Sequence, residues 1–235
     1  MAEKCPYCGA AIGVPTHGRI GNRTFTFPSI CQCEGARAER ARKAAEAEKS
    51  ALDNAVGAAL ERSGMAPIFQ RVAPIDAFAQ AFADGGTVYL HGPVGSGKTT
   101  TAAGIAKWWL YAHAWNPAPG HYTLPPVRFT SSVRILAEFK DSYDGRGGGK
   151  DLMERLTGAR LLVIDDLGQE RPSEWALERL YELADTRYGA GYPTIVTSNY
   201  GTHDLEWHLE KAGSREKASA IIRRLTHKAQ IVQVG

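Results

Sequence analysis

The feature of this 235-residue sequence that most limits its fold is a glycine-rich segment near its middle. The segment fits the pattern G-x-x-x-x-G-K-[ST] at every fixed position and lies between an apolar stretch, residues 87–91, and a helix-forming stretch that starts at residue 98. This context favours a phosphate-binding loop over a chance glycine-rich turn. The residues that we expect to contact a bound nucleotide are Gly92, Pro93, Val94, Gly95, Ser96, Gly97, Lys98, Thr99 and Thr100.

The chemistry of such a loop follows from its residue types. Glycines let backbone N–H groups converge on phosphate oxygens, and the start of the following helix adds positive potential at the same place. Lys98 is expected to contact the β- and γ-phosphates, and the Thr99 hydroxyl to coordinate Mg²⁺. The predicted ligand is therefore ATP or ADP with magnesium.

Two further strand ends carry polar residues. The apolar stretch 161–164 runs into Asp165 and Asp166, and stretch 193–199 ends in Asn199. We assign Asp165 to magnesium and Asp166 to activation of the attacking water, as in other P-loop ATPases. Asn199 is a candidate to bind that water or the γ-phosphate. The alternatives are a solvated acidic turn and a solvated turn asparagine.

A pair of arginines, Arg223 and Arg224, lies near the end of a predicted helix, residues 215–225. An arginine from a neighbouring subunit can stabilise the charge that develops on a transferred phosphoryl group. The alternative is a pair of surface arginines without a catalytic role.

All four cysteines lie in the first 33 residues, as Cys5, Cys8, Cys31 and Cys33. We expect a cytoplasmic protein, because the chain shows no signal peptide or membrane-spanning apolar run, and disulfides are rare in that compartment. Four thiolates suit tetrahedral zinc, although the spacing of Cys31 and Cys33 is less typical than that of the first pair. The alternatives are His17 in place of one cysteine, or reduced cysteines without a metal.

The pattern of apolar stretches predicts the domain organisation. We expect a four-cysteine zinc head at 1–35, a linker helix at 36–63 and an ATPase domain at 64–235. In that domain, strands at 87–91, 127–130, 161–164, 193–199 and 230–234 alternate with helices, including 98–115 and 132–142. This alternation predicts an α/β fold with a parallel five-stranded sheet flanked by helices. Prolines at 117, 119, 125 and 126 predict a connecting loop, and residues 144–149 a flexible one.

Taken together, these segments resemble the AAA+ ATPases of the group formed by DnaC/DnaI helicase loaders and IstB transposition helpers. Residues 64–71 resemble the start of the group's ATPase domain, 161–168 its acidic strand, 197–199 its sensor-1 tip, and 219–225 its arginine-finger helix with Arg224 in the finger position. The resemblance covers residues 64–235. It implies self-association, and no full helical lid, since only eleven residues follow Arg224.

The resemblance also implies partners. A cysteine-rich head is similar to that of DnaI-like loaders, which favours a loader that binds a DnaB-type replicative helicase and single-stranded DNA. An IstB-like helper ATPase acting on double-stranded DNA is the alternative, and a zinc-bearing adaptor that hardly hydrolyses ATP is a third. At the position of Asp166, many AAA+ proteins have glutamate. The longer side chain of glutamate suits fast turnover. We therefore expect slow hydrolysis, stimulated by assembly or DNA.

A net charge of +3 is too small to indicate nucleic-acid binding by itself, so a DNA contact must be local. Residues 134–155 supply basic side chains together with Phe139 and Tyr143. In the resemblance, Tyr143 and Ser173 fall at DNA-contacting positions. The alternative is a solvated charged helix with aromatic side chains in the core, as we expect for Phe139.

Overall fold

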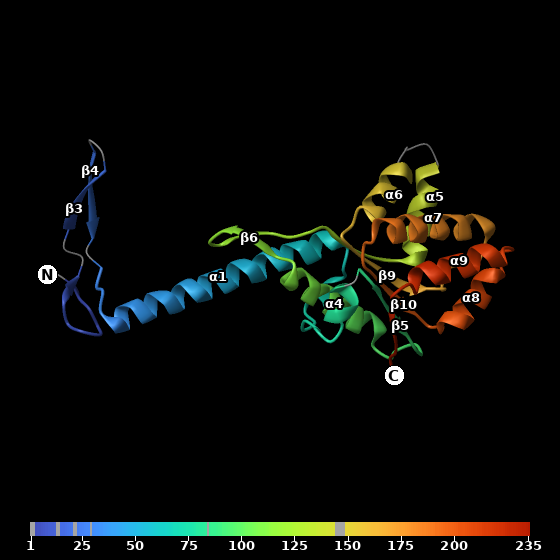
Figure 1. The fold of residues 1–235 in the computed structure, drawn as a ribbon, viewed down its shortest axis with the longest axis horizontal. Coiled ribbons are helices and arrows are strands. Elements are labelled where there is room, and N and C mark those ends of the chain that lie inside the picture. The colour runs from blue at the N-terminus through green and yellow to red at the C-terminus, as the bar shows by residue number, and fades with distance from the viewer. Residues whose placement is uncertain (1–2, 13–14, 21–22, 29, 84, 144–148) are drawn as a thin grey trace. The chain divides into compact units, whose positions relative to one another are not determined.

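The chain forms two compact units, residues 1–53 and 54–235. The computed structural model describes all residues except 1–2, 13–14, 21–22, 29, 84 and 144–148 (Figure 1). Helix α1 (Glu34–Ser63) is continuous across the boundary between the units. Among the described residues, no helix is both long and apolar enough to cross a membrane.

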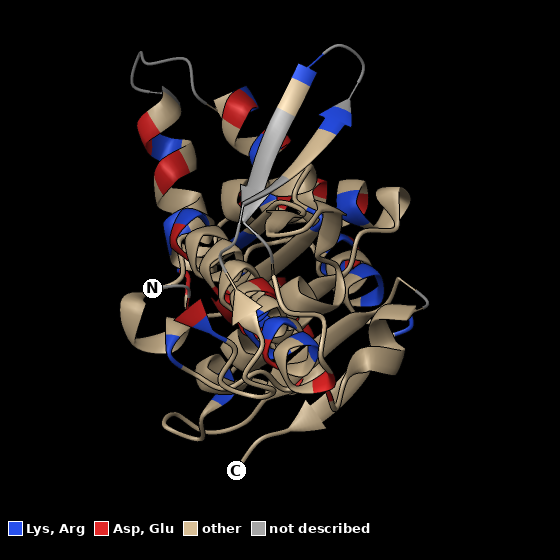
Figure 2. Cartoon of the chain, turned by 90° about the vertical axis from the view of Figure 1, so that its left-hand side faces the viewer, with Lys and Arg blue, Asp and Glu red and all other residues tan. Residues whose placement is uncertain are grey.

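Unit 1 consists of two short hairpins and the first part of α1. Strands β1 (Glu3–Lys4) and β2 (Ala11–Ile12) pair antiparallel, as do β3 (Pro15–Ile20) and β4 (Arg23–Pro28). Helix α1 is rich in alanine and has no proline, which explains why so long a helix forms with few packing partners. The helix carries both acidic and basic residues (Figure 2), and Arg42 pairs with both Glu39 and Glu46.

A five-stranded parallel sheet forms the centre of unit 2. Its strands are, in spatial order, β11 (Gln230–Gln233), β5 (Thr87–His91), β10 (Thr194–Ser198), β9 (Leu161–Leu167) and β8 (Val127–Ser131). The register places Ser198 opposite His91 and Ser131 opposite Asp165. The carboxyl ends of the strands therefore meet at one edge, where open α/β sheets bind their ligands.

Helices cover both faces of this sheet (Figure 1). The helices of unit 2 that follow α1 are α2 (Pro67–Gln70), α3 (Ala79–Ala83), α4 (Lys98–Ala112), α5 (Ser132–Tyr143), α6 (Gly149–Thr157), α7 (Glu174–Ala190), α8 (Thr202–Glu210) and α9 (Arg215–Leu225). Leu162 and Ile164 of β9 share one buried cluster with Leu180 of α7 and Ile221 of α9. Alternate residues of a strand face opposite sides of the sheet, so the residue between Leu162 and Ile164 faces the layer that contains α4.

Two expectations about the segment after α4 were wrong. The helix ends at Ala112 rather than at residue 115, and the expected loop contains a hairpin of β6 (Trp115–Ala118) and β7 (His121–Thr123). The hairpin takes the backbone hydrogen bonds of Trp115, and Pro117 cannot continue a helix. Helices α2, α3 and α8 were not predicted. Most of the loop expected at 144–149 lies outside the described residues.

Candidate functional site

The glycine-rich loop joins β5 to α4 at the carboxyl edge of the sheet. Gly92 has φ 152°, and a Cβ atom there would lie 2.1 Å from the carbonyl oxygen of Val234, so only glycine fits. Gly95 and Gly97 adopt the left-handed conformation, with φ of 83° and 91°. The loop backbone is therefore free to approach a ligand closely.

Lys98 begins α4 and is 5% exposed. Its ammonium group donates hydrogen bonds to the carbonyl oxygens of Gly92 at 2.9 Å and Pro93 at 2.8 Å. The Ser96 hydroxyl is buried and has no hydrogen-bond partner among the described residues. A buried cation, an unpartnered hydroxyl and the start of a helix at one place fit the phosphates of a nucleotide.

A cavity of about 320 Å³ opens beside the loop, within the usual size range of ligand pockets. Its lining consists of Phe69, Val94, Gly95, Gly97, Lys98, Thr99, Thr100, Asp166, Gln169 and Asn199. Most of these residues were predicted site residues. Phe69 and Gln169 were missed, although the segment that contains Phe69 was recognised as the start of the domain.

The carboxylate of Asp165 lies next to Thr99. The Thr99 hydroxyl is 3.0 and 3.1 Å from the two carboxylate oxygens, and the Thr197 hydroxyl donates to one of them at 2.6 Å. Burial raises the pKa of Asp165 above its ordinary value, and the hydrogen bond from Thr197 opposes that rise. A hydroxyl and a carboxylate are the oxygen ligands that Mg²⁺ prefers, so this pair fits the predicted ion.

Asp165 and Asp166 lie inside β9 rather than after it, and they form an irregular step in the strand. Val196 pairs with Ile164, but Ser198 pairs with Leu167, so β9 has one residue more than its partner between these pairs. Asp166 has φ 55°. As a result Asp165 bonds to Thr99 while Asp166 lines the cavity.

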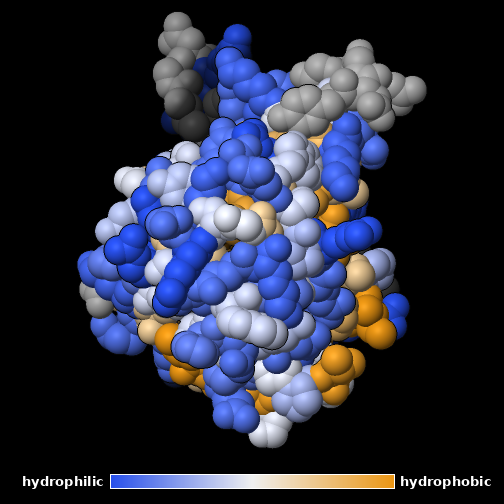
Figure 3. Space-filling model, turned by 90° about the vertical axis from the view of Figure 1, so that its right-hand side faces the viewer, coloured by the Kyte–Doolittle hydropathy of each residue, from blue (hydrophilic) through white to orange (hydrophobic). Residues whose placement is uncertain are grey.

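The structure does not bring all predicted catalytic residues together. Asn199 follows β10 and lines the cavity, half-buried. Arg224 lies in the last turn of α9 and does not line it. Its guanidinium donates to Asp185 and to the Tyr181 hydroxyl, at 3.2 Å for the latter, and lies 4.9 Å from the Tyr181 ring centre. Arg223 beside it is exposed. The face of the molecule drawn in Figure 3 is mainly hydrophilic.

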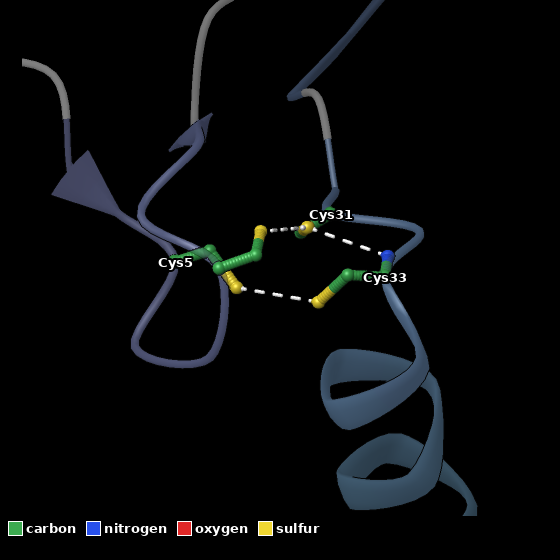
Figure 4. A group of neighbouring side chains, drawn as sticks. Cys5, Cys31 and Cys33 are labelled. Carbon is green, nitrogen blue, oxygen red and sulfur yellow. Dashed lines mark hydrogen bonds between the residues drawn. The ribbon is translucent and has the colours of Figure 1, made fainter.

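The four cysteines form one group in unit 1 (Figure 4). Cys5 and Cys33 have sulfur atoms 3.8 Å apart, Cys8 and Cys31 3.3 Å apart, and all four sulfurs lie within 4.8 Å of one another. Tetrahedral zinc with Zn–S bonds of about 2.3 Å needs sulfurs about 3.8 Å apart, whereas a disulfide needs about 2.05 Å. The group fits a zinc ion, and His17 is not part of it.

Local backbone contacts arrange these cysteines. Cys5 and Cys8 lie in the turn between β1 and β2, where the backbone N–H of Cys5 donates to Ala10 O and that of Gly9 to Cys5 O. Cys33 comes just before α1, and its sulfur accepts from the backbone N–H of Ala36. The backbone N–H of Tyr7 lowers the pKa of the Cys5 thiol to about 7.

The predicted DNA contacts both belong to unit 2. Ser173 caps α7, and its exposed side chain accepts a hydrogen bond from the backbone N–H of Ala176 at 3.2 Å. Tyr143 is the last residue of α5, and its side chain lies outside the described part of the chain. Phe139 is buried in the core, as expected.

The chain is similar to known proteins in sequence and in fold. A protein of Mycobacterium tuberculosis, named as an ATP-binding protein in an insertion sequence, is 33% identical over 115 residues, which cover 49% of this chain and 41% of that protein. The crystal structure of DnaI superposes with a TM-score of 0.58 at 21% identity, covering 73% of this chain and 95% of that one. The DnaC helicase loader superposes with a TM-score of 0.54 at 18% identity, covering 72% and 100%.

These superpositions show that the α/β fold of unit 2, with its parallel five-stranded sheet, matches that of DnaI and DnaC. The match to the curated relative spans less than half of that protein's own length. The sequence model of the family described as IstB-like ATP binding protein matches residues 77–235, which is more than half of the chain. The chain therefore belongs to the IstB-like ATP-binding protein family.

Proposed function

We propose that this protein is an ATP-hydrolysing switch that loads a DnaB-type replicative helicase onto single-stranded DNA. The observation that carries the ATPase part is that the buried Lys98, Thr99 and Asp166 line one cavity, with Asp165 bonded to Thr99. The observation that favours a loader is the four-cysteine group, which lies in a compact unit of its own, unit 1.

Each residue has a distinct task in the proposed hydrolysis. The loop N–H groups and Lys98 bind the phosphates, and Thr99 with Asp165 holds Mg²⁺, which neutralises phosphate charge when bound. Asp166 accepts the proton of the attacking water, and Asn199 orients that water. Arg224 lies outside its own chain's cavity, so we assign it to the nucleotide of a neighbouring subunit.

The domain division proposed with this function is a zinc head at 1–35, a linker helix at 36–63 and the ATPase domain at 64–235. Single-stranded DNA is proposed to contact Tyr143 by stacking and Ser173 by hydrogen bonding. The exposed position of Ser173 at the start of α7 supports the second contact, because a helix start also attracts phosphate.

We expect one zinc ion per chain, held by Cys5, Cys8, Cys31 and Cys33. Metal analysis of purified protein measures the stoichiometry directly. Replacement of Cys5 and Cys8 by serine removes two thiolates and is expected to abolish zinc retention while the affinity for ATP stays unchanged. The assignment is contradicted if wild-type protein, purified under reducing conditions, contains no zinc and does not take it up from solution.

A transposition helper that acts on double-stranded DNA is the second candidate. Membership of the IstB-like family and the insertion-sequence name of the Mycobacterium tuberculosis relative favour it. The two candidates share the ATPase chemistry and differ in partner, so the partner decides between them.

The deciding experiment is capture of a purified replicative helicase by the full-length chain, with single-stranded DNA and ATP. We expect the wild type to retain the helicase and the Cys5→Ser, Cys8→Ser double variant to lose it while still binding ATP. This variant is preferable to deletion of residues 1–62, because Val56 and Leu60 of α1 are buried in unit 2 and their loss would damage the ATPase core.

A parallel reaction offers double-stranded DNA and the transposase of an insertion sequence to the same two proteins. If the wild-type chain captures the transposase and not the helicase, the transposition helper replaces the loader as the proposed function. A double variant that still captures helicase would place the contact outside the cysteine group.

A further inference from the structure

Glu170 is a buried acidic residue close behind the irregular step in β9, and nothing in the proposed hydrolysis uses it. It is 5% exposed. Its Oε2 atom accepts a hydrogen bond from the backbone N–H of Gly168 at 2.9 Å and lies 2.5 Å from the Ser132 hydroxyl. Its Oε1 atom is buried without a hydrogen-bond partner in the described part of the chain. Burial of an incompletely paired carboxyl group is unfavourable, so a functional reason for it is expected.

Ser132 links Glu170 to the backbone of Asp166. The serine is fully buried, and its hydroxyl lies 3.0 Å from the Asp166 carbonyl oxygen, within donating distance of that atom as well as of Glu170. On the other side, the N–H of Asp166 donates to the Thr197 hydroxyl at 2.9 Å. Side chains from β10 and α5 therefore hold both backbone polar groups of Asp166.

The conformation of Asp166 requires such support. Its φ of 55° lies in the left-handed region that residues with a Cβ rarely adopt. Gly168 follows with φ 95°, and a Cβ atom there would lie 2.8 Å from a Leu205 methyl group. The turn 166–170 thus presents Asp166 and Gln169 to the cavity while Glu170 fixes it from the buried side.

We propose that Glu170 is a positioning residue for ATP hydrolysis, which acts by holding the turn that carries Asp166. The carboxyl group does not line the nucleotide cavity, so its effect passes through Gly168 and Ser132 to Asp166. This inference rests on the proposed function, in which Asp166 activates the attacking water.

Glu170→Ala removes the acceptor and is expected to lower kcat by about 10²-fold, the effect of misplacing a reacting group by roughly 1 Å. ATP affinity should not change, because Lys98, Thr99 and the loop keep their contacts. Glu170→Gln keeps an oxygen acceptor and is expected to recover most of the lost kcat. The measurement is kcat and ATP affinity of folded full-length protein with single-stranded DNA.

Ser63→Ala is the matched control. Ser63 is also buried, and its hydroxyl donates to Leu60 O at 2.6 Å and accepts from the N–H of Met65 at 3.2 Å, without a bond to the turn 166–170. This variant should lose stability and keep kcat. If Glu170→Ala does not fold, Ser132→Ala takes its place, with the same expected fall in kcat at unchanged affinity.

Each outcome has a distinct meaning. Equal kcat in wild type and Glu170→Ala overturns the positioning role alone. A Glu170→Gln variant as slow as Glu170→Ala also overturns the positioning role, because the acceptor oxygen would then not be the cause of the effect. A loss of ATP affinity in parallel with the loss of kcat overturns it as well. A wild type that binds ATP with single-stranded DNA and helicase but never hydrolyses it overturns the proposed ATPase function, and the positioning role with it.

Discussion

Lys98→Ala should abolish tight ATP binding. The Lys98 ammonium is the buried cation at the phosphate loop, and each hydrogen bond from such a group to a charged oxygen is worth about 1.5–3 kcal/mol. Loss of two such bonds corresponds to about 10²-fold or more in affinity. Titration of a fluorescent ATP analogue into wild type and variant measures the difference.

Lys107→Ala is the control for this substitution. Lys107 lies on the same helix, α4, and also donates to two backbone carbonyl oxygens, those of Gln70 at 3.0 Å and Val72 at 3.1 Å. It does not line the cavity, so its loss should affect stability without a comparable loss of affinity. Wild-type affinity in a well-folded Lys98→Ala protein would refute the assignment of the nucleotide site.

Arg224→Ala should remove the hydrolysis that assembly stimulates. A cation donated to the γ-phosphate by a neighbouring subunit is worth about 10³–10⁵ in rate. Within its own chain Arg224 is bound to Asp185 and Tyr181, so contact with a neighbour's phosphate exchanges one anionic partner for another. The measurement is ATP turnover with helicase and single-stranded DNA present.

Complementation tests whether the arginine acts between subunits. Arg224→Ala and Lys98→Ala are each expected to be inactive, but a mixed assembly contains interfaces with an intact nucleotide site and an intact arginine, so activity should partly return. Arg223→Ala, a change of the exposed neighbour, should retain activity. If Arg224→Ala turns over ATP like wild type and Arg223→Ala does not, the finger is Arg223.

Local sequence signals predicted the parts of the fold that local chemistry determines. Helix α9 has the predicted bounds, and strand β5 ends where the loop pattern begins, because caps, glycines and apolar runs are themselves local. The hairpin at 115–123 depends on pairing between residues that carry no strand pattern, and Pro117 suggested only a loop. Helix α8 was missed because its buried residues, Leu205 and Leu209, are too few to give a helical apolar pattern in the sequence.

The site was predictable to the extent that its residues lie in motifs. Thr99 and Asp165 are 66 positions apart, yet their contact follows from strand ends that meet at one edge of a sheet. The support of Asp166 by Ser132 and Glu170 was not predictable. It depends on one additional residue in β9, which changes the face to which side chains point and has no sequence signature of its own.

The contact between the last strand and the phosphate loop offers a way to observe the nucleotide directly. Gln233 is exposed and pairs with His91, the residue before Gly92. The carbonyl oxygen of the next residue, Val234, lies against Gly92, the first residue of the loop. A fluorophore attached at Gln233 would sense movement of the loop without altering any residue that lines the cavity. Its emission during rapid mixing would then time the arrival of ATP and the departure of ADP in single turnovers.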